Sequence, residues 1–178
     1  MTVTNVSQKK PDLILEQYFL GKTFASGIFE DRFGNVRRQF TVDIDGTWDG
    51  KTLTLTEDFI FGDGETETRV WSIEKIAPAS YVGTADDVIG SAKGIVSGNT
   101  LNWKYDMRLK VGGSKVKVHF DDWMFLQPNG VLINKATVSK LGLDIGRVTI
   151  AFTKKADADF LSTISSTNKE PLVATLAR

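Results

Sequence analysis

From Lys22 to Lys154 the chain repeats one pattern, in which apolar and polar residues alternate and a short glycine-containing turn then follows. Alternation with a period of two places successive side chains on opposite faces of a β-strand. Turns this short join antiparallel neighbours, because a parallel connection needs a crossover of roughly a dozen residues or more. We therefore predict an antiparallel meander of about ten strands.

The predicted strands are roughly Lys22–Arg32, Val36–Trp48, Lys51–Phe61, Glu67–Ile76, Ser80–Ala85, Ser91–Val96, Leu101–Lys110, Lys115–Leu126, Val131–Ser139 and Ile145–Lys154. An up-and-down sheet of this size usually closes into a barrel, because closure removes the unpaired backbone groups of edge strands. A barrel of about this strand number can hold one small ligand. The predicted fold is therefore all-β, a single antiparallel up-and-down barrel of the lipocalin or calycin type.

Both ends of the chain lack this alternation. Residues 1–11 are mostly polar and are predicted to be loose. The segment Asp12–Leu20 has Pro11 before it and Gly21 after it, which favours a short helix. We predict one barrel domain over residues 12–155 and a polar tail over residues 156–178, with a short helix around Asp157–Ser165.

Composition excludes several classes of function. Lys+Arg and Asp+Glu both number 22, and this balance argues against a general nucleic-acid or anionic-membrane binder, because such binding needs a basic excess, but it leaves a local basic patch open. The absence of cysteine excludes disulfides, thiolate nucleophiles and Cys-bound zinc. No apolar run is long enough for a membrane span or a signal peptide, so we expect a cytoplasmic protein, or a periplasmic one if a leader was removed. We expect neither a cofactor nor a metal, and the sequence leaves the oligomeric state open.

One predicted strand interrupts its own apolar face. In Lys51–Phe61 the residues on that face are Leu53, Leu55, Glu57, Phe59 and Phe61. Folding back over Gly62-Asp63-Gly64 pairs Leu53 with Ile73, Leu55 with Trp71 and Glu57 with Arg69. A buried carboxylate is costly without a partner, and Arg69 supplies one. The pair is either a polar anchor for an otherwise apolar ligand or a cross-strand ion pair that fixes the register.

The hairpin over Gly112-Gly113 predicts a second inward charge. A two-residue turn pairs Leu109 with Val116, Met107 with Val118, Tyr105 with Phe120 and Trp103 with Asp122, and on the other face Asp106 with His119 and Lys104 with Asp121. A slip of one residue would set apolar side chains opposite charges, so the register is well specified. Asp122 is then either a general acid or base with a raised pKa, or a carboxylate that accepts hydrogen bonds from Trp103, Asn134 or backbone amides.

Other candidate motifs favour structural roles. The segment Gly83–Gly94 contains Asp86 and Asp87 but lacks the spacing of phosphate-binding or calcium-binding loops. It predicts a sharply bent strand pair, with a loop at the barrel mouth as the alternative. His119 is the only histidine and points outward beside Asp106, which indicates an ordinary surface residue. Of the four tryptophans, Trp48, Trp71 and Trp103 fall on faces that could line a cavity, whereas Trp123 has the opposite parity.

Five stretches together resemble a bacterial family catalogued as domain of unknown function 3833. They are E-D-F-I-F-G-D-G with R-V-W (Glu57–Trp71), G-T-A-D-D-V-I-G-S-A-K-G (Gly83–Gly94), G-N-T-L-N-W-K-Y (Gly98–Tyr105), F-D-D-W-M-F-L (Phe120–Leu126) and N-K-A-T-V-S-K-L-G (Asn134–Gly142). The resemblance covers roughly Gly21–Lys154 and implies a lipocalin-like barrel without an assigned activity. Many family members look like small lipoproteins, and some occur in settings linked to membrane-lipid modification, which implies lipid as a ligand.

Two features limit what the resemblance carries over. The chain has neither a leader nor a lipobox cysteine, so we do not expect the membrane anchoring of the lipoproteins. True lipocalins open with a G-x-W signature, of which Gly21-Lys22-Thr23-Phe24 is only a loose analogue. The comparison with lipocalins therefore extends to the architecture alone.

These observations lead to one hypothesis and two alternatives. The hypothesis is a barrel that binds a small apolar or amphipathic molecule of the lipid or fatty-acyl type. Its predicted ligand-binding residues are Glu57, Phe59, Arg69, Trp71, Trp103, Tyr105, Phe120, Asp122 and Asn134. The first alternative is an enzyme, an isomerase, cyclase or hydratase, with Glu57 or Asp122 as acid or base. The second is a scaffold barrel with a filled core and an exposed apolar patch.

Overall fold

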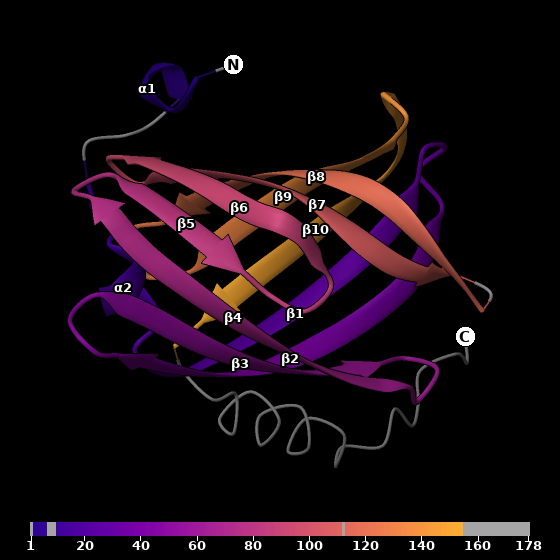
Figure 1. The fold of residues 1–178 in the computed structure, drawn as a ribbon, viewed down its shortest axis with the longest axis horizontal. Helices are drawn as coiled ribbons and strands as arrows, with labels where there is room; N and C mark the ends of the chain where they lie inside the picture. The colour runs from indigo at the N-terminus through magenta and orange to yellow at the C-terminus, as the bar shows by residue number, and fades with distance from the viewer. Residues whose placement is uncertain (1, 7–9, 112, 155–178) are drawn as a thin grey trace, which may run out of the picture.

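The computed structural model describes residues 2–6, 10–111 and 113–154, and within them ten strands form a closed antiparallel barrel (Figure 1). The strands are β1 (Gly21–Asp31), β2 (Val36–Trp48), β3 (Thr52–Phe61), β4 (Thr66–Ala77), β5 (Ser80–Thr84), β6 (Val88–Ser97), β7 (Thr100–Val111), β8 (Ser114–Leu126), β9 (Leu132–Lys140) and β10 (Leu143–Thr153). Each strand pairs with its neighbours in the sequence, and β1 closes the ring by pairing with β10. The predicted all-β, up-and-down barrel of the lipocalin type is confirmed.

The N-terminal segment closes one end of the barrel. The predicted helix is shorter than Asp12–Leu20, because only the single turn α2 (Leu15–Tyr18) is helical and Ile14 before it is extended. Leu13, Leu15 and Phe19 are buried in the barrel core, and the Leu13 amide donates to the Gly98 carbonyl at 2.8 Å. Burial of these apolar residues thus fixes the segment where helix propensity alone would not. A second turn, α1 (Val3–Val6), precedes it, and the helix predicted at Asp157–Ser165 lies outside the described residues.

The two halves of the barrel interior differ in exposure. Near α2 the inward-facing residues are fully buried, as Thr23, Leu53 and Leu132 show. At the opposite end the inward-facing aromatic residues are only partly buried, and they include Phe29, Phe40, Phe59 and Phe61. The inward-facing side chains are therefore covered at the α2 end and partly exposed at the other, which we call the open end.

Both strand pairings that the sequence specified are present in the barrel. Glu57 lies opposite Arg69 in the β3–β4 pair, and Leu55 lies opposite Trp71. In the β7–β8 pair Trp103 lies opposite Asp122, and Tyr105 lies opposite Phe120. The alternation of apolar and charged residues was strong enough in both hairpins to exclude any shifted register.

The glycines of the Gly83–Gly94 segment serve packing as well as bending. The β6–β7 register shifts between Ile89 and Lys93, so the strand is irregular there as predicted. In addition, the Trp103 indole lies directly over Gly83 and Gly94. A Cβ atom at Gly94 would come within 2.4 Å of Trp103 Cε3, and one at Gly83 within 2.6 Å of Cζ2. The barrel wall is therefore free of side chains where the indole packs.

We predict that Gly94→Ala destabilises the barrel, because the new methyl group would overlap the Trp103 ring and force it to move. Overpacking of this kind costs about 1–3 kcal/mol, which urea denaturation monitored by tryptophan fluorescence would measure. Gly62→Ala is the matched control, since a Cβ atom there lies 3.6 Å from its nearest neighbour, the Gln39 carbonyl oxygen. Equal unfolding midpoints for the two variants would contradict the packing role.

Candidate functional site: a charged cluster inside the barrel

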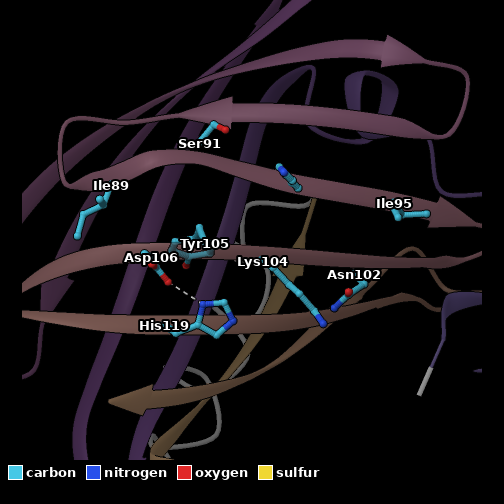
Figure 2. Close-up of a pocket in the computed structure, with 9 residues that line it drawn as sticks. Ile89, Ser91, Ile95, Asn102, Lys104, Tyr105, Asp106 and His119 are labelled. Carbon is cyan, nitrogen blue, oxygen red and sulfur yellow. Dashed lines mark hydrogen bonds and ion pairs between the residues drawn. The ribbon is translucent and has the colours of Figure 1, made fainter. Parts of the chain in front are cut away.

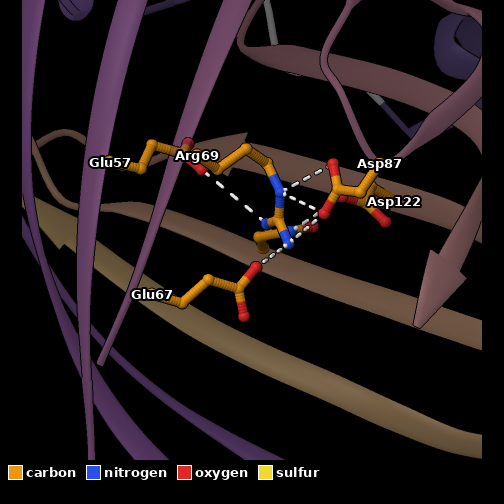
Figure 3. Close-up of polar contacts among 6 residues, drawn as sticks. Glu57, Glu67, Arg69, Asp87 and Asp122 are labelled. Atoms are coloured by element: carbon orange, nitrogen blue, oxygen red, sulfur yellow. Dashed lines mark hydrogen bonds and ion pairs between the residues drawn. The ribbon is translucent and has the colours of Figure 1, made fainter. Parts of the chain in front are cut away.

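Arg69 lies at the centre of a group of acidic side chains inside the barrel (Figure 3). Its Nε donates to Asp87 Oδ2 at 2.9 Å and its Nη2 lies 2.8 Å from the same oxygen. Nη2 also donates to Glu67 Oε1 at 3.0 Å, whereas Glu57 Oε2 is 3.9 Å from Nη1. The predicted Glu57–Arg69 pair therefore exists, but the closest partner of Arg69 is Asp87. We call Glu57, Glu67, Arg69, Asp87 and Asp122 the interior cluster.

The contact between Arg69 and Asp87 bridges a part of the wall that β5 does not cover. β5 is short and pairs with β4 only over Ser72–Ala77, so the first half of β4 pairs with β3 alone among the described strands. Asp87 lies in the turn between β5 and β6, near the open end. The sequence does not indicate the direction of the Asp86 and Asp87 side chains, because alternation defines side-chain direction in strands and not in turns.

Glu57 is a largely buried carboxyl with an altered pKa. Its side chain is 15% exposed, as is that of Arg69. Burial raises the pKa of Glu57 to about 7, while Arg69 and a hydrogen bond from Trp71 lower it and the nearby Asp87 charge raises it further. Because Arg69 is shared with two other acids, it offsets the desolvation of Glu57 only in part.

Asp122 is a buried carboxyl, and one of its two oxygen atoms accepts no hydrogen bond from the described residues. It is 5% exposed, and its Oδ2 accepts a hydrogen bond from Asn134 Nδ2 at 3.2 Å, one of the three donors named in the structural alternative for this residue. Its Oδ1 and the Oδ1 of Asn134 are buried and have no hydrogen-bond partner within the described parts of the chain. Burial raises the pKa of Asp122 to about 7, and the hydrogen bond from Asn134 lowers it. Two side chains that are joined by one hydrogen bond thus each retain a buried acceptor atom without a partner among the described residues.

Most of the aromatic residues predicted to line the ligand site pack against one another in the middle of the barrel. Trp71 makes edge contacts with Trp103 and Tyr105, with ring centres 5.7 and 5.4 Å apart. Tyr105 stacks on Phe120 with parallel rings 5.0 Å apart. Burial raises the pKa of the Tyr105 hydroxyl well above its usual value. Of the aromatic residues predicted for the site, these four fill the core beneath the interior cluster.

Phe59 belongs instead to an aromatic group at the open end. Its ring lies 5.9 Å from Phe40 and 6.0 Å from Phe61, and the Arg69 guanidinium is 5.2 Å from its ring centre. All three rings are partly exposed although they face inward. Phe40 and Phe61 were not named as site residues, but the alternation in β2 and β3 places both on the apolar face.

The outer wall carries two shallow depressions. One, of about 410 Å³, lies along β6 and β7 and is lined mostly by outward-facing residues, including Lys93, Lys104 and His119 (Figure 2). There His119 Nδ1 is 2.8 Å from Asp106 Oδ1, consistent with its predicted surface position. The other, of about 620 Å³, lies on β1, β2, β3 and β10, and its lining combines outward-facing residues with Phe40 and Phe61 of the aromatic group at the open end. Neither depression is lined by Glu57, Arg69 or Asp122, so the interior cluster is separate from both.

No group of three or more His, Cys, Asp or Glu side chains in residues 2–6, 10–111 and 113–154 is arranged to hold a metal ion. None of the helices in the same part of the chain is long and apolar enough to cross a membrane.

Comparisons with known proteins agree with this architecture. The model of the family described as "Protein of unknown function (DUF3833)" matches residues 1–154, and the chain belongs to this family. Its fold is similar to that of the S-type phycobiliprotein lyase CPES from Guillardia theta, with a TM-score of 0.58 and 6% sequence identity. That match covers 79% of this chain and 90% of the lyase chain. No curated protein matches the sequence.

We predict that the raised pKa values of Glu57 and Asp122 make the protein less stable as the pH rises. Below about pH 4 both carboxyls are protonated in the folded and unfolded states; between about pH 4 and pH 7 the unfolded chain releases protons that the folded state retains. The contribution of these two carboxyls to the free energy of unfolding therefore falls across this window and stays low above it. Asp122→Asn should gain about 4 kcal/mol over the wild type at pH 8, the full pKa shift of Asp122, and little at pH 4, as measured by urea denaturation.

Asp144→Asn is the control for this experiment, because Asp144 is exposed on β10. Its unfolding curves should follow those of the wild type at both pH values. A loss of stability of Asp122→Asn at pH 8 would show that the ionised carboxylate stabilises the fold.

Proposed function

We propose that this protein binds a small amphipathic molecule inside the barrel, with the apolar part near the open end and the polar head at the interior cluster. The observation that carries the proposal is the pair of buried acceptor atoms without partners, Asp122 Oδ1 and Asn134 Oδ1. Leaving a buried acceptor unpaired costs about 1–3 kcal/mol. A ligand that donates hydrogen bonds to these atoms would recover that free energy.

The charges of the interior cluster favour a particular head group. Arg69 faces Glu57, Glu67 and Asp87, so its positive charge is already balanced by acids. A carboxylate ligand would find these acids nearby and little free positive charge. A neutral or cationic head with hydrogen-bond donors, such as a hydroxyl, an amide or an amine, fits the cluster better than an anion does.

The apolar part of the ligand would contact the aromatic group at the open end. Phe40, Phe59 and Phe61 face inward yet retain exposed surface, which a bound chain would cover. Burial of apolar surface contributes about 25 cal/mol per Å². This supports a molecule with a lipid-like or fatty-acyl body, seated above the packed core of Trp71, Trp103, Tyr105 and Phe120.

Native mass spectrometry with three ligands of equal chain length, oleyl alcohol, oleylamine and oleic acid, would test this proposal. At pH 8, where Glu57 and Asp122 are mostly ionised, we expect the alcohol and the amine to bind and the acid to bind about tenfold more weakly or not at all. Asp122→Asn should weaken the preference for the amine, and Asp144→Asn should leave it unchanged. Preference for oleic acid would contradict the proposed head group, and failure of all three to bind would contradict the ligand class.

A second candidate function is an enzyme of the isomerase, cyclase or hydratase type. The observation that favours it is the pKa of about 7 of Glu57 and Asp122, which suits a group that takes and returns a proton near neutral pH. The similar barrel from Guillardia theta is named a lyase, which supports the use of this architecture by enzymes.

Deuterium exchange would separate the enzyme from a simple binding protein. An acid or base acting on a bound molecule should move solvent deuterium onto carbon when the protein and a ligand identified by native mass spectrometry are incubated in D₂O. We expect the exchange to be lost in Asp122→Asn or Glu57→Gln although binding persists. Binding without any exchange in the wild-type protein would rule out this candidate for that ligand.

A further inference from the structure

The open end of the barrel is bordered by five hairpin turns, and three consecutive ones differ from the other two in charge. These three are the β1–β2 turn (residues 31–38), the β9–β10 turn (residues 140–147) and the β7–β8 turn (residues 108–117), which we call the basic rim. Together they contain nine basic and two acidic residues. The β3–β4 turn (residues 62–67) and the β5–β6 turn (residues 85–87) contain five acidic residues and no basic one. The open end is therefore polarised.

Large apolar side chains protrude from two turns of the basic rim. Phe33 is 74% exposed, Leu141 95% and Leu143 69%, and Val36 beside them is also exposed. Leu141 has a φ of 50°, a left-handed conformation that a branched apolar residue rarely adopts. Leucine is not required at this position for burial within the barrel, and the left-handed backbone conformation does not favour it. We therefore take its exposed side chain as a sign of a partner outside the barrel.

These two apolar turns are adjacent in space. β1 and β10 pair along their length up to Asp31 opposite Gly146, and the Arg32 amide donates to the Ile145 carbonyl at 3.1 Å beyond that point. Figure 1 shows the β1–β2 and β9–β10 turns projecting side by side at one end of the barrel. Phe33 and Leu141 therefore lie on neighbouring tips, with Arg32 next to Phe33 and Lys140 next to Leu141.

The β7–β8 turn adds positive charge to the same side of the open end. β8 pairs with β9 only from His119 onward, so the residues of β8 that precede His119 extend past β9. Lys110 lies opposite Lys115 in this hairpin, and both side chains are exposed, as are Arg108 and Lys117. Four basic residues thus lie on a hairpin that contains no acidic residue between residues 108 and 117.

We propose that the basic rim docks the open end of the barrel onto a lipid bilayer that contains anionic lipids. Exposed Phe and Leu side chains can enter the boundary between headgroups and acyl chains, while nearby Lys and Arg are attracted to anionic headgroups. A second copy of the chain is a poorer partner, because setting the apolar tips of two copies against each other would also bring their basic residues together. A nucleic acid would use the charge but would leave the protruding apolar side chains without a role.

This inference does not depend on the ligand proposed above, since the rim residues lie outside the interior cluster. If both hold, the docked open end would let an amphipathic molecule pass between the bilayer and the barrel without crossing water. Membrane docking can fail while ligand binding succeeds, and the reverse is also true, so separate measurements distinguish them.

Co-sedimentation with vesicles tests the docking directly. We expect the wild-type protein to bind vesicles of phosphatidylcholine with one third phosphatidylglycerol, and to bind phosphatidylcholine alone at least about tenfold more weakly. Phe33→Ser with Leu141→Ser should lower binding to the anionic vesicles about tenfold or more. Lys110→Glu with Lys115→Glu should do the same, and raised salt should weaken binding by the wild-type protein.

Two double variants serve as matched controls. Ile76→Ser with Ile95→Ser removes apolar residues that are 58% and 55% exposed away from the rim. Lys93→Glu with Lys104→Glu reverses two exposed lysines that face each other across β6 and β7, as Lys110 and Lys115 do across β7 and β8. Both controls should bind anionic vesicles like the wild-type protein.

Several results would overturn the proposal. Absence of vesicle binding, or equal binding to neutral and anionic vesicles, would contradict a basic docking surface. Equal losses in the rim variants and the controls would place the contact elsewhere. Analytical ultracentrifugation provides the remaining test: a dimer that Phe33→Ser with Leu141→Ser dissociates would assign the apolar tips to a second copy of the chain.

Discussion

The ion pairs of the Arg69 guanidinium are the interactions on which the arrangement of charges inside this barrel depends. The guanidinium is largely buried and contacts acids from three places in the chain: Glu57 on β3, Glu67 at the start of β4, and Asp87 in the β5–β6 turn. Because β5 is too short to cover the first half of β4, the Arg69–Asp87 contact joins parts of the wall that backbone hydrogen bonds do not. One buried cation thus links these parts of the wall and brings three carboxyl groups together around it.

The division of the barrel into a filled and an accessible half follows from where large side chains meet. Near α2 the N-terminal plug of Leu13, Leu15 and Phe19 closes the end, and the indole of Trp103 packs over bare backbone at Gly83 and Gly94. Above this layer Phe40, Phe59 and Phe61 face inward but are not fully covered. The interior cluster lies between the two halves, where a polar head group and an apolar chain can be bound together.

Much of the fold could be read from the sequence, and the reason is physical. Alternation with a period of two defines strands, and short turns restrict them to antiparallel neighbours, so the ten strands and the β3–β4 and β7–β8 registers were predictable. The same alternation identified Glu57 and Asp122 as inward-facing charges. Asp87 was not identified as a partner of Arg69, because its turn obeys no periodicity. The extent of the helix was also overestimated, since burial of Leu13 and Phe19 overrides the local signals.

The sequence by itself determined the strand order, the inward face of each strand and the presence of charge on it, since these follow from local patterns of hydrophobicity. The tertiary structure decided which charges meet, which aromatic residues fill the core, and which end of the barrel is accessible. Those properties arise from contacts between residues far apart in the chain, such as Arg69 with Asp87 and Trp71 with Trp103. They depend on barrel closure and side-chain packing, which act only once all ten strands are in place.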